Sequence, residues 1–471
     1  MRSSTGPRSV PTPTSAPPTT ISRSSSSSST RFPTIPLSDS VAALAGHWPV
    51  GAEVDRKGRL RLGGIDAAAL ARRYGTPLYV YDAATVRQAY REQKAAFRGL
   101  GPVRISYAMK ACPLLGVAAL LASARADASV VSLGELLAAK RAGFAPSRMQ
   151  LHGNAKTDEE LRGALRAGIG RVVIDGAEEV DRLAALIRRG GTVSVWLRVS
   201  PGIDVDTHTY LRTGTLDSKF GASISTGDAL DQARRISRTR GLRLIGIHAH
   251  LGTQLHEAER YRELGAALAT LARDVREATG VTVREVAVGG GLGIRLRADD
   301  RVLDVRAYAE AVTAPIRAET TVERATVYCE PGRALVGRAA VALYRVVATK
   351  RVPGVRTFVS VDGGMGDNIR PALYDARYDA VVAERAGATG GEVAVAGKYC
   401  ESGDILIREV RLPDPVPGET IAIPASGAYS VAMASNYNHH TRPAVVLIDR
   451  GRARLIRRRE SHADIWRLER R

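Results

Sequence analysis

The chain has 471 residues, of which 44% are hydrophobic and 25% are charged, a composition typical of globular proteins. This apolar content excludes disorder along the whole chain. The longest apolar run, residues 114–124, is about half of the roughly 20 residues that a membrane-spanning helix needs, which excludes a transmembrane protein. The three cysteines are far apart and form no CxxC pair. This argues against a disulfide framework or a structural zinc site and favours the reducing cytoplasm.

The formal net charge of +20 is concentrated at the two ends of the chain. Residues 1–31 contain four arginines and no acidic residue, and residues 450–471 contain nine arginines and three acidic residues. The remaining excess is thinly spread and lacks the interleaved aromatic residues of a nucleic-acid surface. We therefore expect neither a nucleic acid nor a membrane as a partner.

The N-terminal residues 1–37 are predicted to be a disordered tail, because they are rich in serine and proline and almost free of apolar anchors. An Arg- and Ser-rich start without acidic residues is also typical of an organelle transit peptide, and this alternative stays open. Residues 38–79 contain short apolar runs and are expected to join a β domain formed by the C-terminal part of the chain.

Between residues 80 and 334, short apolar runs alternate with amphipathic stretches of helical spacing. This alternation predicts a parallel sheet, and eight repeats over about 250 residues match a (β/α)8 barrel of the TIM type. An open, doubly wound sheet is the alternative. The predicted strands are residues 103–109, 129–132, 149–152, 171–174, 193–199, 242–250, 285–288 and 326–329.

Polar or glycine residues follow strand after strand, and this placement favours the barrel. In a barrel the carboxyl ends of all strands converge on one mouth, whereas in an open sheet they spread along an edge. The residues concerned are Lys110, His152, Asn154, Asp175, Arg198, His250, Gly289, Gly290, Gly291, Glu330 and Arg333.

The chain changes character after residue 335. Residues 339–347, 357–361 and 419–423 are rich in β-branched residues and are separated by Gly and Pro turns. This pattern predicts an antiparallel β domain over residues 335–471. The expected fold class is therefore α/β, a (β/α)8 barrel with a C-terminal antiparallel β domain.

Lys110 ends the first predicted barrel strand, where its amine is placed to form an imine with a carbonyl compound. Desolvation at such a position makes a lysine nucleophilic. A lysine that reaches from the strand end into solvent is the alternative, and the position alone does not decide between the two.

The loops after the seventh and eighth strands suit a phosphate. Consecutive glycines at 289–291 let backbone N–H groups approach a phosphate closely, although the GxGxxG pattern of dinucleotide sites is not met. Arg333 is a candidate to bind the same phosphate through charge-assisted hydrogen bonds. Glu330 is a candidate to accept a hydrogen bond from the ring nitrogen of a pyridoxal cofactor. The alternatives are a flexible glycine turn and a surface ion pair.

Two histidines and one cysteine complete the candidates. His248 and His250 share one strand face, but no carboxylate or cysteine stands at a supporting spacing, so no metal site is predicted. His250 lies at the barrel mouth, and its ring is expected to stack on a flat cofactor. Cys400 begins a polar turn, and because thiols are mostly protonated at neutral pH it suits the role of a proton donor.

In these motifs the chain resembles the fold-type III pyridoxal-phosphate-dependent decarboxylases, and among them the diaminopimelate decarboxylases. The resemblance runs from about residue 74 to residue 443. Its most specific segments are residues 152–156, 207–221, 362–365, 400–404 and 434–438.

The resemblance implies a pyridoxal 5′-phosphate site and a homodimer that shares its active sites. Lys110 matches the lysine that carries the cofactor, and Cys400 matches the acid that protonates the substrate's Cα across the dimer interface. The other implied cofactor contacts are His250, Thr253, Gly289, Gly290, Gly291, Glu330, Arg333 and Tyr429. The implied substrate contacts are Arg333, Arg370, Tyr374, Glu401 and Tyr429.

The implied reaction is the decarboxylation of meso-2,6-diaminopimelate to L-lysine and carbon dioxide, the last step of lysine biosynthesis. Arg370 and Glu401 favour such a substrate on physical grounds. A distal amino-acid group needs both a cation and an anion, whereas the tail of a simple diamine needs only carboxylates.

Three residues depart from the family pattern, namely Cys112, Ser129 and Leu133, and all are expected near the cofactor. They leave open a related decarboxylase that acts on another amino acid in a specialised pathway. A binding-only relative is a further alternative, but the presence of both Lys110 and Cys400 argues against it. An amino-acid racemase on the same barrel is the last alternative, and the residues for a distal carboxylate argue against that one.

Overall fold

The computed structural model describes Leu44, residues 46–203 and residues 218–470. The predicted disordered tail at residues 1–37 and the first part of the family motif at residues 207–221 lie outside the described residues. None of the helices in these ranges is long and apolar enough to cross a membrane.

Eight parallel strands form a closed barrel. Each strand pairs with its neighbour in chain order, and β13 pairs with β5 to complete the ring. The predicted (β/α)8 barrel is therefore confirmed, and the open sheet is excluded. The strands are β5 (Val103–Ala108), β6 (Asp127–Val130), β7 (Met149–Leu151), β8 (Arg171–Ile174), β9 (Val193–Ser200), β11 (Leu242–His248), β12 (Glu285–Ala287) and β13 (Thr326–Cys329).

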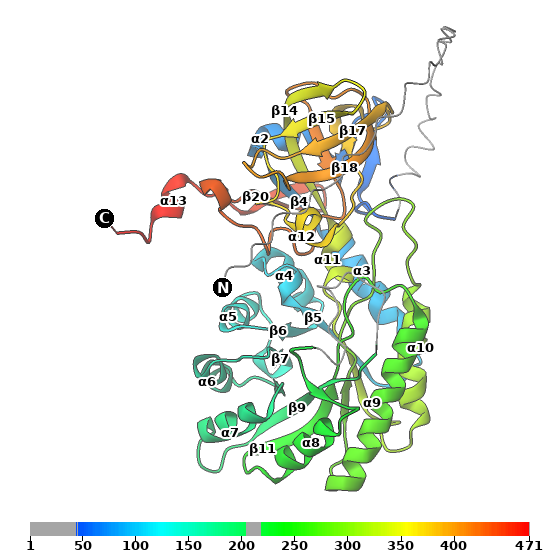
Figure 1. The fold of residues 1–471 in the computed structure, drawn as a ribbon, viewed down its shortest axis with the longest axis vertical. Helices are drawn as coiled ribbons and strands as arrows, with labels where there is room; N and C mark the ends of the chain where they lie inside the picture. The colour runs from blue at the N-terminus through cyan, green and yellow to red at the C-terminus, as the bar shows by residue number, and fades with distance from the viewer. Residues whose placement is uncertain (1–43, 45, 204–217, 471) are drawn as a thin grey trace, which may run out of the picture. The chain divides into compact units, whose positions relative to one another are not determined.

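Helices follow the strands and surround the barrel (Figure 1). Their starts are encoded locally, as in α6, where the Thr157 side chain accepts a hydrogen bond from the Glu160 backbone and the Glu160 carboxylate accepts one from the Thr157 backbone. The helices are α3 (Ala83–Ala96), α4 (Leu115–Ser123), α5 (Leu133–Arg141), α6 (Asp158–Ala167), α7 (Ala177–Leu186), α8 (Asp228–Arg238), α9 (Ala258–Thr279), α10 (Val305–Ala318) and α11 (Arg333–Val336).

One barrel strand begins and ends two residues earlier than predicted. The sequence suggested residues 129–132, but β6 covers Asp127–Val130. Ser132 cannot extend the strand because its side chain caps α5, where it accepts a hydrogen bond from the Glu135 backbone at 3.1 Å. Asp127 enters the strand instead, since its carboxylate binds Arg104 on the neighbouring β5 at 2.7 Å.

Charged side chains at the amino ends of the strands are paired with one another. Arg171 at the start of β8 binds Glu285 at the start of β12, with 2.8 Å between Nε and Oε2. The indole of Trp196 donates to the same carboxylate at 2.7 Å. Such pairs stabilise this face of the barrel, whereas chemistry is carried out at the opposite, carboxyl face.

The second sheet contains β4 (Leu78–Asp82) and the strands that follow the barrel. Its main path runs β18-β17-β15-β14-β4-β20-β21, and β14 also pairs with β19, which pairs with β16. These strands are β14 (Ala340–Val352), β15 (Arg356–Val361), β16 (Val381–Val382), β17 (Gly391–Ala396), β18 (Ile405–Leu412), β19 (Thr420–Ile423), β20 (Ala444–Asp449) and β21 (Arg452–Arg457).

This sheet is mixed, so the prediction of an antiparallel sheet is only partly right. β15 pairs with β17 and β4 pairs with β20 in parallel, while the other pairs are antiparallel. Parallel neighbours need a long crossover. The connection from β15 to β17 provides one, because it contains the short helix α12 (Arg370–Tyr374).

The segment before β4 forms a small sheet of its own. β1 (Ala52–Val54), β2 (Leu60–Leu62) and β3 (Ile65–Asp66) are antiparallel neighbours, and α2 (Ala67–Tyr74) follows them. Leu60 and Leu62 belong to one buried cluster with Val341 and Val446 of the mixed sheet. The predicted domain boundary between residues 79 and 80 falls inside β4, a strand of that sheet.

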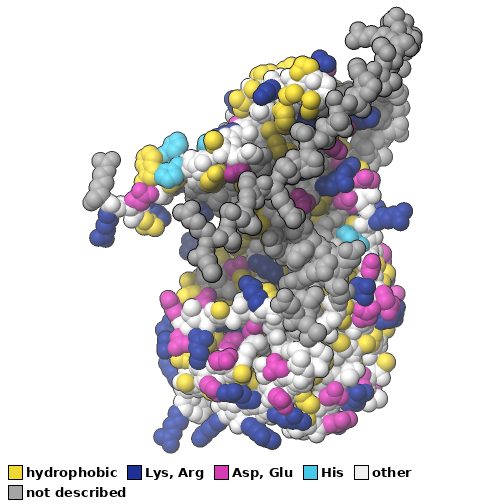
Figure 2. Space-filling view, viewed as in Figure 1, with side chains coloured by type: hydrophobic (Ala, Val, Ile, Leu, Met, Phe, Trp, Pro, Cys, Tyr) yellow, Lys and Arg dark blue, Asp and Glu magenta, His cyan; other side chains and the backbone are white. Residues whose placement is uncertain are grey.

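The chain ends in a short helix, α13 (His462–Trp466). On the face of the molecule drawn in Figure 2, basic and acidic side chains are interspersed over the barrel. Where the barrel surface is drawn in colour, it shows no broad basic patch in spite of the net charge of +20.

Candidate active site

A cavity of about 470 Å³ lies at the carboxyl ends of the barrel strands, within the usual size range of small-molecule sites. It brings together most of the residues singled out in the sequence. The predicted site residues that line it are Lys110, His250, Thr253, Gly290, Gly291, Glu330, Arg333, Arg370, Tyr374 and Tyr429. His152, Asn154 and Arg198, chosen for their strand-end positions, line it as well, whereas Asp175 does not.

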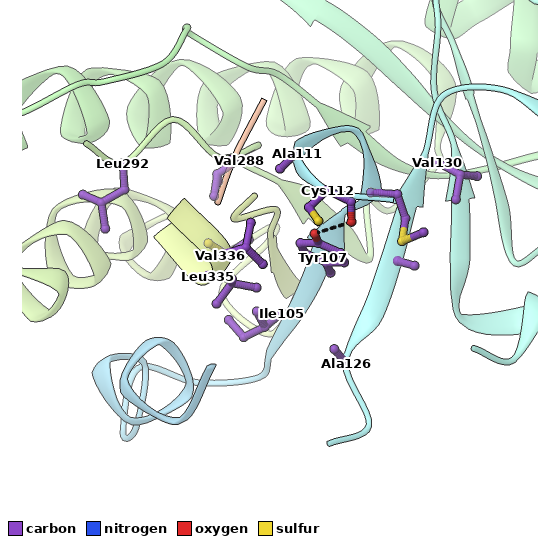
Figure 3. Packing of buried hydrophobic residues seen from close by; sticks show 14 of the residues in the cluster. Ile105, Tyr107, Ala111, Cys112, Ala126, Val130, Val288, Leu292, Leu335 and Val336 are labelled. Carbon is purple, nitrogen blue, oxygen red and sulfur yellow. Dashed lines mark hydrogen bonds between the residues drawn. The ribbon is translucent and has the colours of Figure 1, made fainter. Parts of the chain in front are cut away.

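Lys110 lies on a 3-10 turn, η1 (Met109–Ala111), directly after β5. The turn is fixed from below by the Tyr107 hydroxyl, which donates to the Cys112 carbonyl at 2.8 Å (Figure 3). From the side, the Tyr429 backbone N–H donates to the Ala111 carbonyl at 2.8 Å. The turn carries Lys110 beyond the buried part of the strand, so its side chain is exposed in the single chain. The desolvation that we expected at the strand end is therefore absent in the single chain.

Glu330 is buried at the end of β13, where three side chains from other strands surround its carboxylate. The Ser129 hydroxyl donates to Oε1 at 2.9 Å, and His152 Nε2 lies 3.0 Å from the same oxygen. His248 Nε2 lies 3.0 Å from Oε2. Burial acts to raise the pKa of Glu330, but the two imidazoles outweigh it and hold this pKa well below its ordinary value. Glu330 is therefore an ionised acceptor that faces the cavity.

Among the described residues, His152, His248 and Glu330 form the one group of three whose ligand atoms lie close enough for a metal, within 4.8 Å of one another. The sequence reasoning missed this group because the carboxylate comes from a strand distant in sequence. Burial lowers the pKa of His248 to about 4, so its imidazole is neutral at neutral pH. Both Nε2 atoms face Glu330 itself at hydrogen-bonding distance, and the carboxylate thus already has partners within the protein.

The glycine loop packs tightly against His250. The Gly290 backbone N–H donates to His250 Nδ1 at 3.3 Å. A Cβ atom on Gly289 would lie 2.7 Å from that ring and 2.7 Å from the Ala249 carbonyl, and its φ of +65° also favours glycine. Gly289 thus stands behind the cavity wall. Burial, followed by Lys110, lowers the pKa of His250 well below its ordinary value, so the ring that faces the cavity is neutral.

Arg333 and Arg370 place two buried guanidinium groups at the cavity, with exposures of only 5% and 2%. Arg333 Nε and Nη2 lie 3.4 Å from Thr253 Oγ1. The Tyr429 ring faces both, at 4.9 Å from Arg333 and 5.9 Å from Arg370. Burial and the neighbouring Arg370 lower the pKa of Arg333 to about 10. Over residues 46–203 and 218–470, no carboxylate lies within ion-pair distance of either arginine, in contrast to the paired charges at the other end of the barrel.

Two such groups are costly to bury without an anion, so the cavity suits an anionic ligand. Lys110 supplies an amine, Glu330 an ionised acceptor, and His250 a flat neutral ring. This donor set fits a flat carbonyl compound that carries a phosphate and a ring N–H, the chemistry of pyridoxal 5′-phosphate.

Cys400 and Glu401 lie outside this cavity and are exposed. Their turn is built around the buried Asp404, whose carboxylate accepts backbone hydrogen bonds from Met365 at 2.6 Å and Tyr399 at 2.8 Å. The Cys400 backbone N–H donates to Asn438 Oδ1 at 3.0 Å. The turn therefore has a fixed shape and presents both side chains to the surface.

Only one of the three departures from the family pattern lines the cavity. Ser129 does so, beside Glu330. Cys112 is buried below the Lys110 turn, where its thiol lies 3.3 Å from the Tyr81 hydroxyl. Leu133 packs toward α6, where its Cδ1 would lie 2.7 Å from a Cβ atom on Gly163. Cys112 and Leu133 therefore do not line the cavity, although Cys112 adjoins the turn that carries Lys110.

Sequence reasoning also missed Tyr378. Its hydroxyl accepts a hydrogen bond from Arg370 Nε at 3.0 Å, and both side chains are buried. Gln93 and Met433 line the cavity and had no sequence signal, whereas Phe220 lies in the family segment 207–221.

Comparison with known proteins gives a consistent result. Residues 83–337 match the family model described as pyridoxal-dependent decarboxylase, pyridoxal binding domain. The diaminopimelate decarboxylase of Bacillus subtilis is 39% identical over 421 residues, which cover 88% of this chain and 96% of that protein. The enzyme of that name from Actinosynnema pretiosum is 41% identical over 444 residues, or 93% and 98% of the two chains. The structure of diaminopimelate decarboxylase from M. jannaschii in complex with L-lysine superimposes with a TM-score of 0.83 at 31% identity, covering 88% and 97%.

Proposed function

Because the chain belongs to the pyridoxal-dependent decarboxylases and, within them, to the diaminopimelate decarboxylase family, we propose that it converts meso-2,6-diaminopimelate to L-lysine and carbon dioxide. One observation carries the proposal. A single cavity holds the Lys110 amine, the ionised Glu330 and two buried arginines that lack a carboxylate partner among the described residues. An amino acid with a second carboxylate and a phosphate-bearing cofactor together supply the anions that this cavity lacks.

Pyridoxal 5′-phosphate, when bound, supplies an electron-withdrawing ring that accepts the electron pair left by the departing carbon dioxide. Lys110 would hold its carbonyl carbon, and Glu330 would accept a hydrogen bond from the ring nitrogen. His250 would pack against the ring. The glycine loop at 289–291, Thr253 and Arg333 would hold the phosphate, and Tyr429 would be a further contact of the cofactor.

The distal end of the substrate is held by a cation and an anion. Arg370 binds the distal carboxylate together with Tyr374 and Arg333, and Tyr378 keeps the Arg370 guanidinium in place. Glu401 binds the distal ammonium. A substrate with a second amino-acid group at its distal end offers a carboxylate and an ammonium to these residues. Ornithine lacks the distal carboxylate and would leave buried cations unpaired.

Cys400 donates the proton to Cα after carbon dioxide has left. In the single chain, Cys400 and Glu401 are exposed on a rigid turn outside the cavity. We therefore infer that they serve the cavity of a second copy, in a homodimer with two shared sites. The proposal also places the enzyme in the cytoplasm, where free thiols such as those of its cysteines stay reduced.

The test is release of carbon dioxide from a panel of amino acids by protein supplied with the cofactor. The panel contains the diaminopimelate isomers, lysine, ornithine and arginine. The meso isomer should be used with a kcat/KM at least about 10²-fold above lysine, ornithine and arginine, because each of these lacks the distal carboxylate and leaves a buried charge unpaired. Equal turnover of ornithine or lysine would contradict the proposal.

A further inference from the structure

Among the described residues, Ser129 is the one side chain on the wall of the cavity that donates an O–H to Glu330. It lies on β6, with an exposure of 5%, and approaches Oε1 at 2.9 Å. Glu330 comes from β13, so this contact joins two strands that are not neighbours in the barrel ring. The contact therefore forms only when the barrel closes, and no local turn produces it.

The direction of this hydrogen bond follows from the chemistry of its partners. An ionised carboxylate only accepts, so the proton must belong to the Ser129 hydroxyl. Behind Ser129, the Ser106 hydroxyl lies 2.9 Å away and also lies 2.6 Å from Gln150 Oε1. Ser106 and Gln150 are fully buried. Because the single Ser129 proton goes to Glu330, the Ser106 hydroxyl is the donor behind it, to Ser129 Oγ or to Gln150 Oε1, and this buried pair packs against the Ser129 side chain.

The charges around Glu330 make a neutral donor at position 129 important. Glu330 is the carboxylate of the cluster, and His248 beside it is a neutral imidazole at neutral pH. Arg198, which also lines the cavity, is already engaged with Asp175, at 3.7 Å between Nε and Oδ1. The Ser129 hydroxyl and the His248 ring thus fix one carboxylate oxygen each without adding charge.

We propose that Ser129 is a positioning residue that aims the Glu330 carboxylate at the ring nitrogen of the bound cofactor. Loss of the hydroxyl would leave Oε1 with His152 alone and would let the carboxylate turn away from the ring. This inference rests on the proposed function, since it assumes that Glu330 meets the nitrogen of pyridoxal 5′-phosphate. It assigns no direct contact with the reacting atoms to Ser129.

The test compares two cofactors that differ in one ring atom. Pyridoxal 5′-phosphate and its 1-deaza analogue, which carries C–H in place of the ring nitrogen, are titrated into cofactor-free protein, and the ratio of their dissociation constants is measured. Wild type should prefer the natural cofactor by about 10-fold or more, the value of one charge-assisted hydrogen bond. Ser129→Ala should reduce this preference by about 3- to 10-fold, through weaker binding of the natural cofactor alone.

A matched control removes another buried hydroxyl of the barrel. Thr313 lies on α10 and donates to the Ala309 carbonyl of its own helix, and Thr313→Val should keep the wild-type ratio. If Ser129→Ala keeps the wild-type ratio, or weakens both cofactors equally, Ser129 has no specific effect on the ring nitrogen and the inference fails. If wild type itself shows no preference, the assignment of Glu330 in the proposed function fails instead.

Discussion

Arg370 donates a hydrogen bond from Nε to the Tyr378 hydroxyl at 3.0 Å, and both side chains are buried. Tyr378→Phe removes the acceptor while keeping the ring, so the guanidinium loses its orientation and keeps an unpaired donor. Because the distal end of the substrate does not react, we expect KM for diaminopimelate to rise about 10-fold or more with kcat little changed. Steady-state kinetics measure both constants.

A control for this change is Tyr261→Phe. The Tyr261 hydroxyl is buried and has no hydrogen-bond partner among the described residues, so its loss should leave KM and kcat unchanged. A fall in kcat with constant KM in Tyr378→Phe would show instead that Arg370 acts on the reacting end of the substrate.

Lys110 is expected to be the single site of covalent attachment of the cofactor. The chain has eight lysines, and Lys156 is another that lies near the barrel mouth. Lys156 is buried and its Nζ lies 2.7 Å from Glu179 Oε1, so its amine is held by a salt bridge while that of Lys110 faces the cavity. Borohydride reduction followed by peptide mapping should find the cofactor on Lys110. An adduct on Lys156, or no adduct, would contradict the assignment.

Asp367 should make the stability of the protein fall as pH rises. Burial raises the pKa of this carboxyl from 3.8 to about 7, so between these values the folded state holds a proton that the unfolded state has lost. The folded state is therefore favoured at low pH, and this advantage disappears as pH rises through about 7. In Asp367→Asn the residue no longer titrates.

The expected result concerns the difference in the free energy of unfolding between Asp367→Asn and wild type. This difference should shift in favour of the variant by at most about 1.4 kcal/mol per pH unit between about pH 5 and about pH 7. Denaturant unfolding at several pH values measures it, with the exposed Glu53→Gln as the control. A difference that does not change with pH would mean that Asp367 titrates normally in the folded protein.

Much of the barrel site could be predicted because the pattern that encodes a βα repeat is local. Each strand end is marked by a short apolar run that gives way to a polar residue, and a parallel barrel brings all such ends together. Lys110, His250, Glu330 and Arg333 were found in this way, and all four line the one cavity. The shift of β6 was missed because Ser132 is equally suited to a strand end and to a helix cap, and only the packed helix decides.

The partners of these residues could not be predicted, since they depend on closure of the barrel. Ser129, His152 and His248 meet at Glu330 from three other strands. The sequence spacing of these residues does not predict that they lie close together. The mixed sheet was missed for a related reason, because the parallel pair of β4 and β20 joins segments from opposite ends of the chain.

Cys400 presents the reverse case, a residue with a specific motif that the single chain keeps out of the cavity. Its turn is held by Asp404 and by Asn438, and its side chain is exposed. Movement of the turn into its own cavity would break these hydrogen bonds. A second copy supplies the thiol without that cost, which is why we expect the two catalytic groups of one site to come from different chains.

Cys400→Ala should keep the cofactor and lose at least about 10²-fold in turnover, because a positioned acid contributes roughly 10²–10⁴. Mixing it with Lys110→Ala protein tests the shared site. Subunit exchange at random gives heterodimers in which one site has both groups, up to about a quarter of all sites in a symmetric dimer. Recovered activity should approach that fraction, well above the residual activity of either variant alone. Full activity of Cys400→Ala would remove the thiol from the mechanism, and no recovery in a verified heterodimer would place both groups on one chain.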